Sequence, residues 1–221
     1  MNEQQQSLET LQDIKRMMER SGRFISLSGL SGVSAGICAL VGAAVAYPYV
    51  ERHKDGLTSC KISSGLSGGM ESIVQLPLFW IAAATFCAAL LSSFIFTFLK
   101  SRREHTALWG SSARRLLINV SVPLLAGGFI LLRLIQQGNN SLLAPGCLIF
   151  YGLALINASK YTLNEIRYLG YCQIILGIIG LWYGGYGLYL WAFGFGVLHI
   201  VYGAYMWWKY EKNLQKDILT T

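Results

Sequence analysis

The long apolar stretches of this 221-residue chain contain very few polar residues, and those few are the places where chemistry could occur. An ionisable side chain is costly inside a bilayer and is a functional hypothesis by default. No Asp or Glu lies in the middle of any stretch, which counts against a proton- or sodium-coupled transporter. Paired carboxylates, a Ser-His-Asp arrangement, a two-metal cluster, a buried lysine and a CxxC pair are also missing. The sequence therefore assigns no catalytic residue, no metal and no cofactor, and it argues against an enzyme without excluding one.

His199 is the one histidine within an apolar stretch, and it shares a helical face with Phe195, Tyr202 and Met206. The first interpretation is a structural histidine, hydrogen-bonded across a helix bundle to a serine or tyrosine. A proton-sensitive or ligand-binding role for His199 and Tyr202 is the second. Metal ligation is the third, although helical partners for a metal are lacking. A haem would require a second membrane histidine.

A second polar group is predicted at one depth, near the cytoplasmic ends of the third, fourth and fifth apolar stretches. Its amides are Asn119, Asn157 and Gln173, and its charged residues are Arg114, Arg115, Lys160, Glu165 and Arg167. Capping of helix ends with a rim of snorkelling basic side chains is one explanation. A polar pocket or a partner-docking surface is the other, and basic clusters at this depth can also bind anionic headgroups.

The elements that position these residues are six apolar stretches, each long enough for a transmembrane helix of about 20 residues. The chain is 53% hydrophobic and 13% charged, whereas soluble domains have about 25% charged residues. Apart from Arg133, the stretches contain no Lys, Arg, Asp or Glu. The spans are predicted at residues 24–47, 73–99, 116–135, 142–159, 169–186 and 188–208. The predicted fold is therefore an all-α, six-span bundle between cytoplasmic segments at 1–23 and 209–221.

Lys and Arg in the connections give this bundle a direction, because basic residues favour the cytoplasmic side. With both termini in the cytosol, fourteen of the 18 basic residues lie inside and four outside, these being Arg52, Lys54, Lys61 and Arg133. The reversed topology would invert this ratio. The net charge of +7 is explained by the asymmetry, so a nucleic-acid partner is not required. We expect a multi-pass protein of the cell (inner) membrane with the lipid bilayer as its surroundings.

Residues 7–23 are predicted to form an amphipathic helix before the first span. Leu8, Leu11, Ile14 and Met18 recur at three- and four-residue spacing and would form one apolar stripe. Such a helix can lie on the inner leaflet, or it can dock a protein partner or a second copy of the chain.

Small residues indicate where helices approach closely. Ser28, Gly32 and Gly36 form a ridge at i+4 spacing in the first span, and Gly196 and Gly203 share a face of the sixth. Such ridges usually pack within one chain, and a homodimer is the alternative. Pro123 is predicted to kink the third span.

Two segments resemble uncharacterised bacterial six-helix inner-membrane proteins of about this length. These are residues 23–32 (RFISLSGLSG) and residues 145–152 (PGCLIFYG) running on to 160–163 (KYTL). The resemblance implies the topology but no activity. Two functional hypotheses therefore remain. The first is a non-enzymatic interaction or regulatory protein, and the alternative is a small-molecule or lipid transporter or channel with a polar site among helices three to six.

Overall fold

The computed structural model describes residues 29–56, 77–103 and 111–211, and these contain helices and turns but no strand. The first five helices are α2 (Gly29–Gly56), α4 (Pro77–Arg103), α5 (Ser111–Gln136), α6 (Leu143–Ala158) and α7 (Ile166–Trp182). The last helix is continuous but changes its winding, from α8 (Gly187–Trp191) through the π-helical η3 (Ala192–Leu198) and α9 (His199–Met206) to the π-helical η4 (Trp207–Glu211). Short 3₁₀ turns, η1 (Asn140–Leu142) and η2 (Gly184–Tyr186), precede α6 and α8. The all-α, six-helix prediction is confirmed for this part of the chain.

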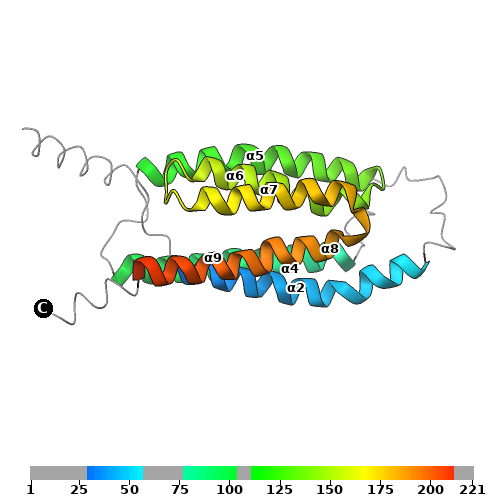
Figure 1. Cartoon of the computed structure of the whole chain (residues 1–221), viewed down its shortest axis with the longest axis horizontal. Helices are drawn as coiled ribbons and strands as arrows, with labels where there is room; N and C mark the ends of the chain where they lie inside the picture. Colours follow the sequence, from blue (N-terminus) through cyan, green and yellow to red (C-terminus); the bar gives the residue numbers. More distant parts are fainter. Residues whose placement is uncertain (1–28, 57–76, 104–110, 212–221) are drawn as a thin grey trace, which may run out of the picture.

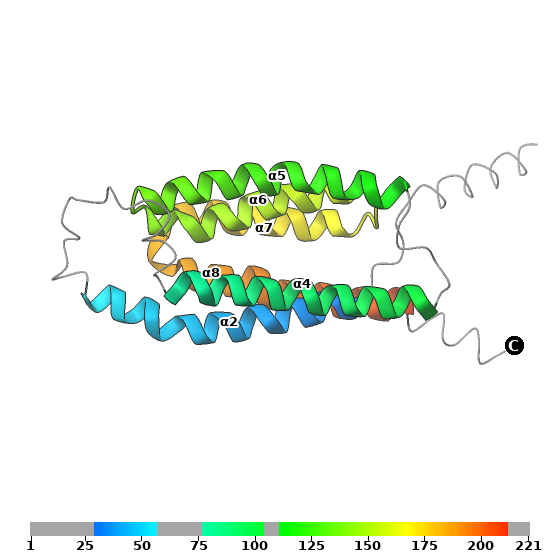
Figure 2. The same ribbon diagram turned by 180° about the vertical axis from the view of Figure 1, so that it is seen from behind.

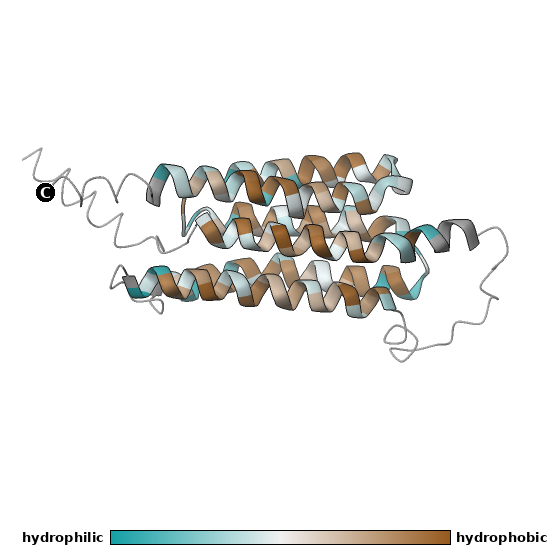
Figure 3. Ribbon diagram, turned by 90° about the horizontal axis from the view of Figure 1, so that it is seen from below, coloured by the Kyte–Doolittle hydropathy of each residue, from teal (hydrophilic) through white to brown (hydrophobic). Residues whose placement is uncertain are grey.

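Five of the six helices are long and apolar enough to cross a membrane. The remaining helix, α7, has 17 residues, which corresponds to a length of about 26 Å at 1.5 Å per residue. Large apolar side chains cover the outside of the bundle; Phe86 is 62% and Phe129 is 73% exposed. Figure 3 shows hydrophobic residues along the length of the helices and hydrophilic residues gathered toward their ends. This surface suits lipid and fits a multi-pass membrane protein.

Several helix boundaries differ from the sequence-based expectation. The second helix ends at Arg103 rather than at 99, and the third begins at Ser111 rather than at 116. The first helix continues through Pro48 to Gly56, where the Tyr47 hydroxyl donates to Glu51 Oε1 at 2.8 Å across one helical turn. The fifth helix occupies 166–182 rather than 169–186, because the backbone leaves the helical region at Tyr183, with φ −112° and ψ 54°. The predicted amphipathic helix at 7–23, the residues between the first two helices and the tail beyond Glu211 lie outside the described residues.

The helices form two layers of three (Figures 1 and 2). In one layer, which we call layer A, α6 lies between α5 and α7. In the other, layer B, α2 lies between α4 and the α8–α9 helix. The first half of the chain thus gives α2 and α4 to layer B and its third helix to layer A. The second half gives α6 and α7 to layer A and its third helix to layer B.

The middle helix of each layer packs very closely on one neighbour because glycines let the backbones meet. In layer B, a Cβ added at Gly203 would lie 2.6 Å from Gly29 O, and one at Gly36 would lie 2.7 Å from Gly196 O. In layer A, a Cβ at Gly152 would lie 2.7 Å from Gly170 O. The ridges predicted in the first and sixth helices therefore pack against each other within one chain. The homodimer stays an untested prediction.

Candidate functional site

The winding of the last helix changes at the point where polar residues meet. Residues 192–198 form a π-helical turn, which changes the regular i to i+4 hydrogen-bonding pattern and is often found at functional sites. The Gly194 carbonyl oxygen in this turn accepts two side-chain hydrogen bonds, from Gln173 Nε2 at 2.8 Å and from His199 Nδ1 at 3.0 Å. The change of winding therefore creates a backbone acceptor that faces side chains rather than the helix alone.

The bond of His199 to Gly194 places a hydrogen on one ring nitrogen. Since Gly194 O can only accept, Nδ1 carries the hydrogen of that bond. Nε2 lies 2.8 Å from the Tyr151 hydroxyl, which donates to a neutral imidazole and accepts from a protonated one. His199 is 6% exposed. The structure thus places the imidazole between α6 and the last helix, with both ring nitrogens hydrogen-bonded.

Gln173 is fully buried, with 0% of its surface exposed. Its Nε2 also approaches His199 Nδ1 to 3.5 Å, but both atoms carry hydrogens in this arrangement, so this is a contact between donors. Its other amide atom, Oε1, is buried without a hydrogen-bond partner in the described part of the chain. Oε1 lies against Gly194, where an added Cβ would be only 2.6 Å away. Gln173 therefore retains one unused buried acceptor.

We call Tyr151, Gln173, Gly194 and His199 the central polar cluster. Aromatic rings enclose one side of it: Phe195 stacks on His199 at 5.8 Å between centroids, and Tyr151 lies 4.9 Å from Phe195. Gln173 is the eighth residue of the seventeen in α7. It therefore lies at the middle of its helix, whereas the sequence interpretation placed it within about a turn of the inner end.

The other predicted polar residues do not join this cluster by any hydrogen bond that the structure describes. Tyr202 is half-buried on α9, one turn from His199. Asn119 Nδ2 donates to Arg115 O at 2.8 Å within its own helix. Asn157 is half-buried, and its side chain makes no hydrogen bond within the described ranges. The three amides therefore do not form one pocket.

Most of the predicted docking residues lie exposed at one end of the bundle, where α4 and α6 finish and α5 and α7 begin (Figure 1). We call this the basic end and define it by its exposed cations, Arg102, Arg114, Arg115, Lys160 and Arg167. Glu165 is only 19% exposed and forms an ion pair with Lys209, with 2.6 Å between Oε1 and Nζ. Arg167 Nε lies 3.5 Å from Ser159 Oγ. The acid predicted for docking is thus engaged within the chain, across the two layers.

Sequence reasoning missed Tyr151, Gly194 and Lys209. Tyr151 lies on an apolar helix that contains no charged residue, so its type and spacing gave no signal. Gly194 is one of several glycines in its helix, and nothing in the sequence marks a π-helical turn. Lys209 carried a signal, because it follows directly on the aromatic pair Trp207 and Trp208 at the membrane boundary.

The central polar cluster joins a histidine, a tyrosine, an amide and a backbone carbonyl by hydrogen bonds. Among the described residues, no three His, Cys, Asp or Glu side chains come close enough to hold a metal ion. No protein-family model, curated protein or solved structure matches this chain.

Proposed function

We propose that this chain is a non-enzymatic interaction or regulatory protein of the membrane, and that it binds an acidic protein partner at the basic end. The observation that carries the proposal is the contrast between the two polar regions. The side chains of the central polar cluster bond to one another and to the Gly194 carbonyl inside the bundle, whereas the cations of the basic end are exposed.

The charge distribution supports a cytoplasmic position for the basic end, because basic residues favour the cytoplasmic side. The opposite end exposes Arg133 and Glu51. Arg133 Nη1 donates to Gln136 Oε1 at 3.2 Å. A partner that approaches the basic end therefore meets five cations at the level where the helices leave the bilayer. The resemblance to bacterial inner-membrane proteins supports the inner membrane of a bacterium as the location.

Two variants of the full chain test this function. Deletion of residues 1–20 and the double substitution Arg114→Glu/Arg115→Glu should both abolish co-purification of the native partner, by removing the predicted docking helix and by reversing the charge of α5's first turn. Binding of that partner should also weaken with salt. Arg133→Glu is the matched control, because it reverses a charge at the opposite end. Unchanged recovery of the partner by both test variants, with the bundle still folded, would refute the proposal.

A second candidate function is a carrier or channel for small neutral solutes. The observation in its favour is Gln173 Oε1, a buried acceptor without a partner beside a helix with altered winding. Against it, Tyr151, Gln173 and His199 pack on one another. Proteoliposomes should show faster swelling in glycerol or urea if this function is correct, and swelling equal to that of protein-free vesicles argues against it.

A further inference from the structure

The order of helices in the two layers relates the two halves of the chain. Consecutive helices run in opposite directions, so α2, α4 and α5 run opposite to α6, α7 and α9, respectively (Figure 1). Within each half the first two helices pack together, as α2 with α4 and α6 with α7. The third helix of each half packs on the first helix of the other half. This is the arrangement of two inverted repeats that exchange their third helices, and secondary transporters built from inverted repeats change state by moving one repeat or bundle against the other.

Packing between the two layers is concentrated at the end opposite to the basic end. There, α8 contacts α6 and α7. Small residues allow close approach, since a Cβ at Gly187 would lie 3.2 Å from Ala144 and one at Gly180 would lie 3.3 Å from Leu190. The α7–η2–α8 connection also joins the layers at this end. Closely packed interfaces resist deformation, so this end is suited to act as the hinge.

Toward the basic end, the layers are held by polar side chains instead. The first link is the central polar cluster, in which Tyr151 and Gln173 of layer A bond to His199 and Gly194 of layer B. The second is the ion pair between Glu165 of layer A and Lys209 of layer B.

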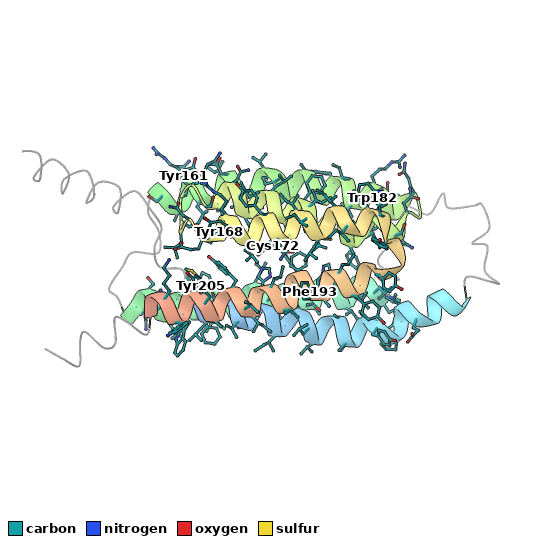
Figure 4. The ribbon with its side chains drawn as sticks, viewed as in Figure 1. Tyr161, Tyr168, Cys172, Trp182, Phe193 and Tyr205 are labelled. Carbon is teal, nitrogen blue, oxygen red and sulfur yellow. The ribbon has the colours of Figure 1, made fainter. Side chains whose placement is uncertain are left out.

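Aromatic side chains along this part of the layer boundary remain exposed. On the facing edges of α7 and α9, Tyr168 is 69% and Tyr205 is 48% exposed, and Cys172 is exposed as well (Figure 4). Each polar link is a small number of hydrogen bonds, and single interhelical hydrogen bonds in membranes contribute little stability. They can therefore exchange without disturbing the packing inside a layer.

We infer that the two layers are hinged at their α8 end and that the central polar cluster sets their separation at the basic end. Of the cations of the basic end, layer A carries Arg114, Arg115, Lys160 and Arg167, and layer B carries Arg102. A change in the separation of the layers therefore changes the spacing of the cations that a partner meets. This regulatory consequence rests on the proposed function, whereas the movement itself does not.

Pulsed electron–electron distance measurements on spin-labelled full-length protein in lipid nanodiscs test the movement. All five native cysteines are first replaced by serine, and two cysteines are then introduced at exposed positions. Leu99 with Leu117 joins the layers near the basic end. Val45 with Ile130 joins them in the opposite half, and Leu117 with Leu153 lies within layer A.

The double substitution Gln173→Leu/His199→Phe removes the cluster's bonds to Gly194 O and to Tyr151. We expect the Leu99–Leu117 distribution to broaden and to shift to longer distances by more than about 2 Å, as in hinge rearrangements of other proteins. The other two pairs should keep the distances of the parent protein. Three unchanged distributions overturn the inference.

If all three distributions broaden, the double variant has lost its fold. The single variants Tyr151→Phe and Lys209→Gln then test the inference with the same three spin-label pairs. Tyr151→Phe removes the hydrogen bond to His199 and Lys209→Gln removes the ion pair with Glu165, and each keeps most of the side chain's volume. A longer Leu99–Leu117 distance in either variant, with the other pairs unchanged, supports the hinge. Parent-like distances in both variants overturn it.

Partner recovery separates this inference from the proposed function. Unchanged distances, together with partner loss in Arg114→Glu/Arg115→Glu, leave the proposed function standing and remove the hinge. Changed distances in the cluster variants, together with full partner recovery by Arg114→Glu/Arg115→Glu, leave the hinge standing and remove the proposed function.

Discussion

Substitution of Gly203 by alanine tests the packing of α2 on α9 directly. The added Cβ would lie 2.6 Å from Gly29 O and from Val33 N. Ordinary contact begins at 3.4 Å, so the two backbones would have to separate by the difference, about 0.8 Å. The atoms on both sides belong to helical backbones and cannot rotate away. We expect Gly203→Ala to lower the free energy of unfolding by about 1–3 kcal/mol, the usual range for an overpacked interior.

Gly128→Ala is the matched control, because no atom lies within 4 Å of the added Cβ. Both substitutions change helix propensity in the same way, so their difference isolates the steric effect. Unfolding by sodium dodecyl sulfate in mixed micelles, followed by circular dichroism, gives the two free energies. Equal stability of the two variants would refute the packing argument.

Three further predictions concern single polar and backbone features. Gln173→Leu removes a donor to Gly194 O and should lower the free energy of unfolding by about 0.6–1.7 kcal/mol in the same assay, and no change would mean that the bond has no net effect. A double-mutant cycle of Glu165→Gln and Lys209→Gln should give a coupling energy of about 0.2–1 kcal/mol that declines with salt, and a coupling that persists in high salt would contradict the partly exposed geometry. Gly138 has φ +73° and open space around it, so Gly138→Ala should cost about 1–2 kcal/mol through the backbone alone, whereas Gly185→Ala, also in open space, should be tolerated.

The helices could be predicted from the sequence because each one faces lipid along much of its length. In a helix such as α5, the outward-facing side chains are apolar as well, and Phe129 is one of them. The reversal after Trp182 was also predictable, because its glycines permit a turn between two apolar stretches. The continuation of α2 beyond Pro48 was not, since proline within a run usually indicates a boundary and its tolerance depends on neighbouring contacts.

The sequence predicted which segments are helices better than it predicted which helices pack together. Glycine ridges indicated that backbones approach one another, but a ridge does not name its partner. Gly203 could have met any helix, and its contact with Gly29 depends on the third helix of each half packing on the first helix of the other. The sequence placed Asn119, Asn157 and Gln173 at one depth because it assigned the fifth helix three residues too late. With α7 starting at Ile166, Gln173 reaches the middle of the bundle, opposite His199.

The two kinds of link between the layers have different consequences in lipid. Apolar helices have no hydrophobic reason to prefer one neighbour to another there, so close packing and hydrogen bonds must select the partner. Glycines and alanine supply the selection at the α8 end, where Gly187 meets Ala144. Toward the basic end, the described residues supply it through Tyr151, Gln173 and His199 and through one ion pair. A chain with an apolar central cluster should therefore still insert and keep both layers, but it should lose the fixed relation between the cations that face the partner.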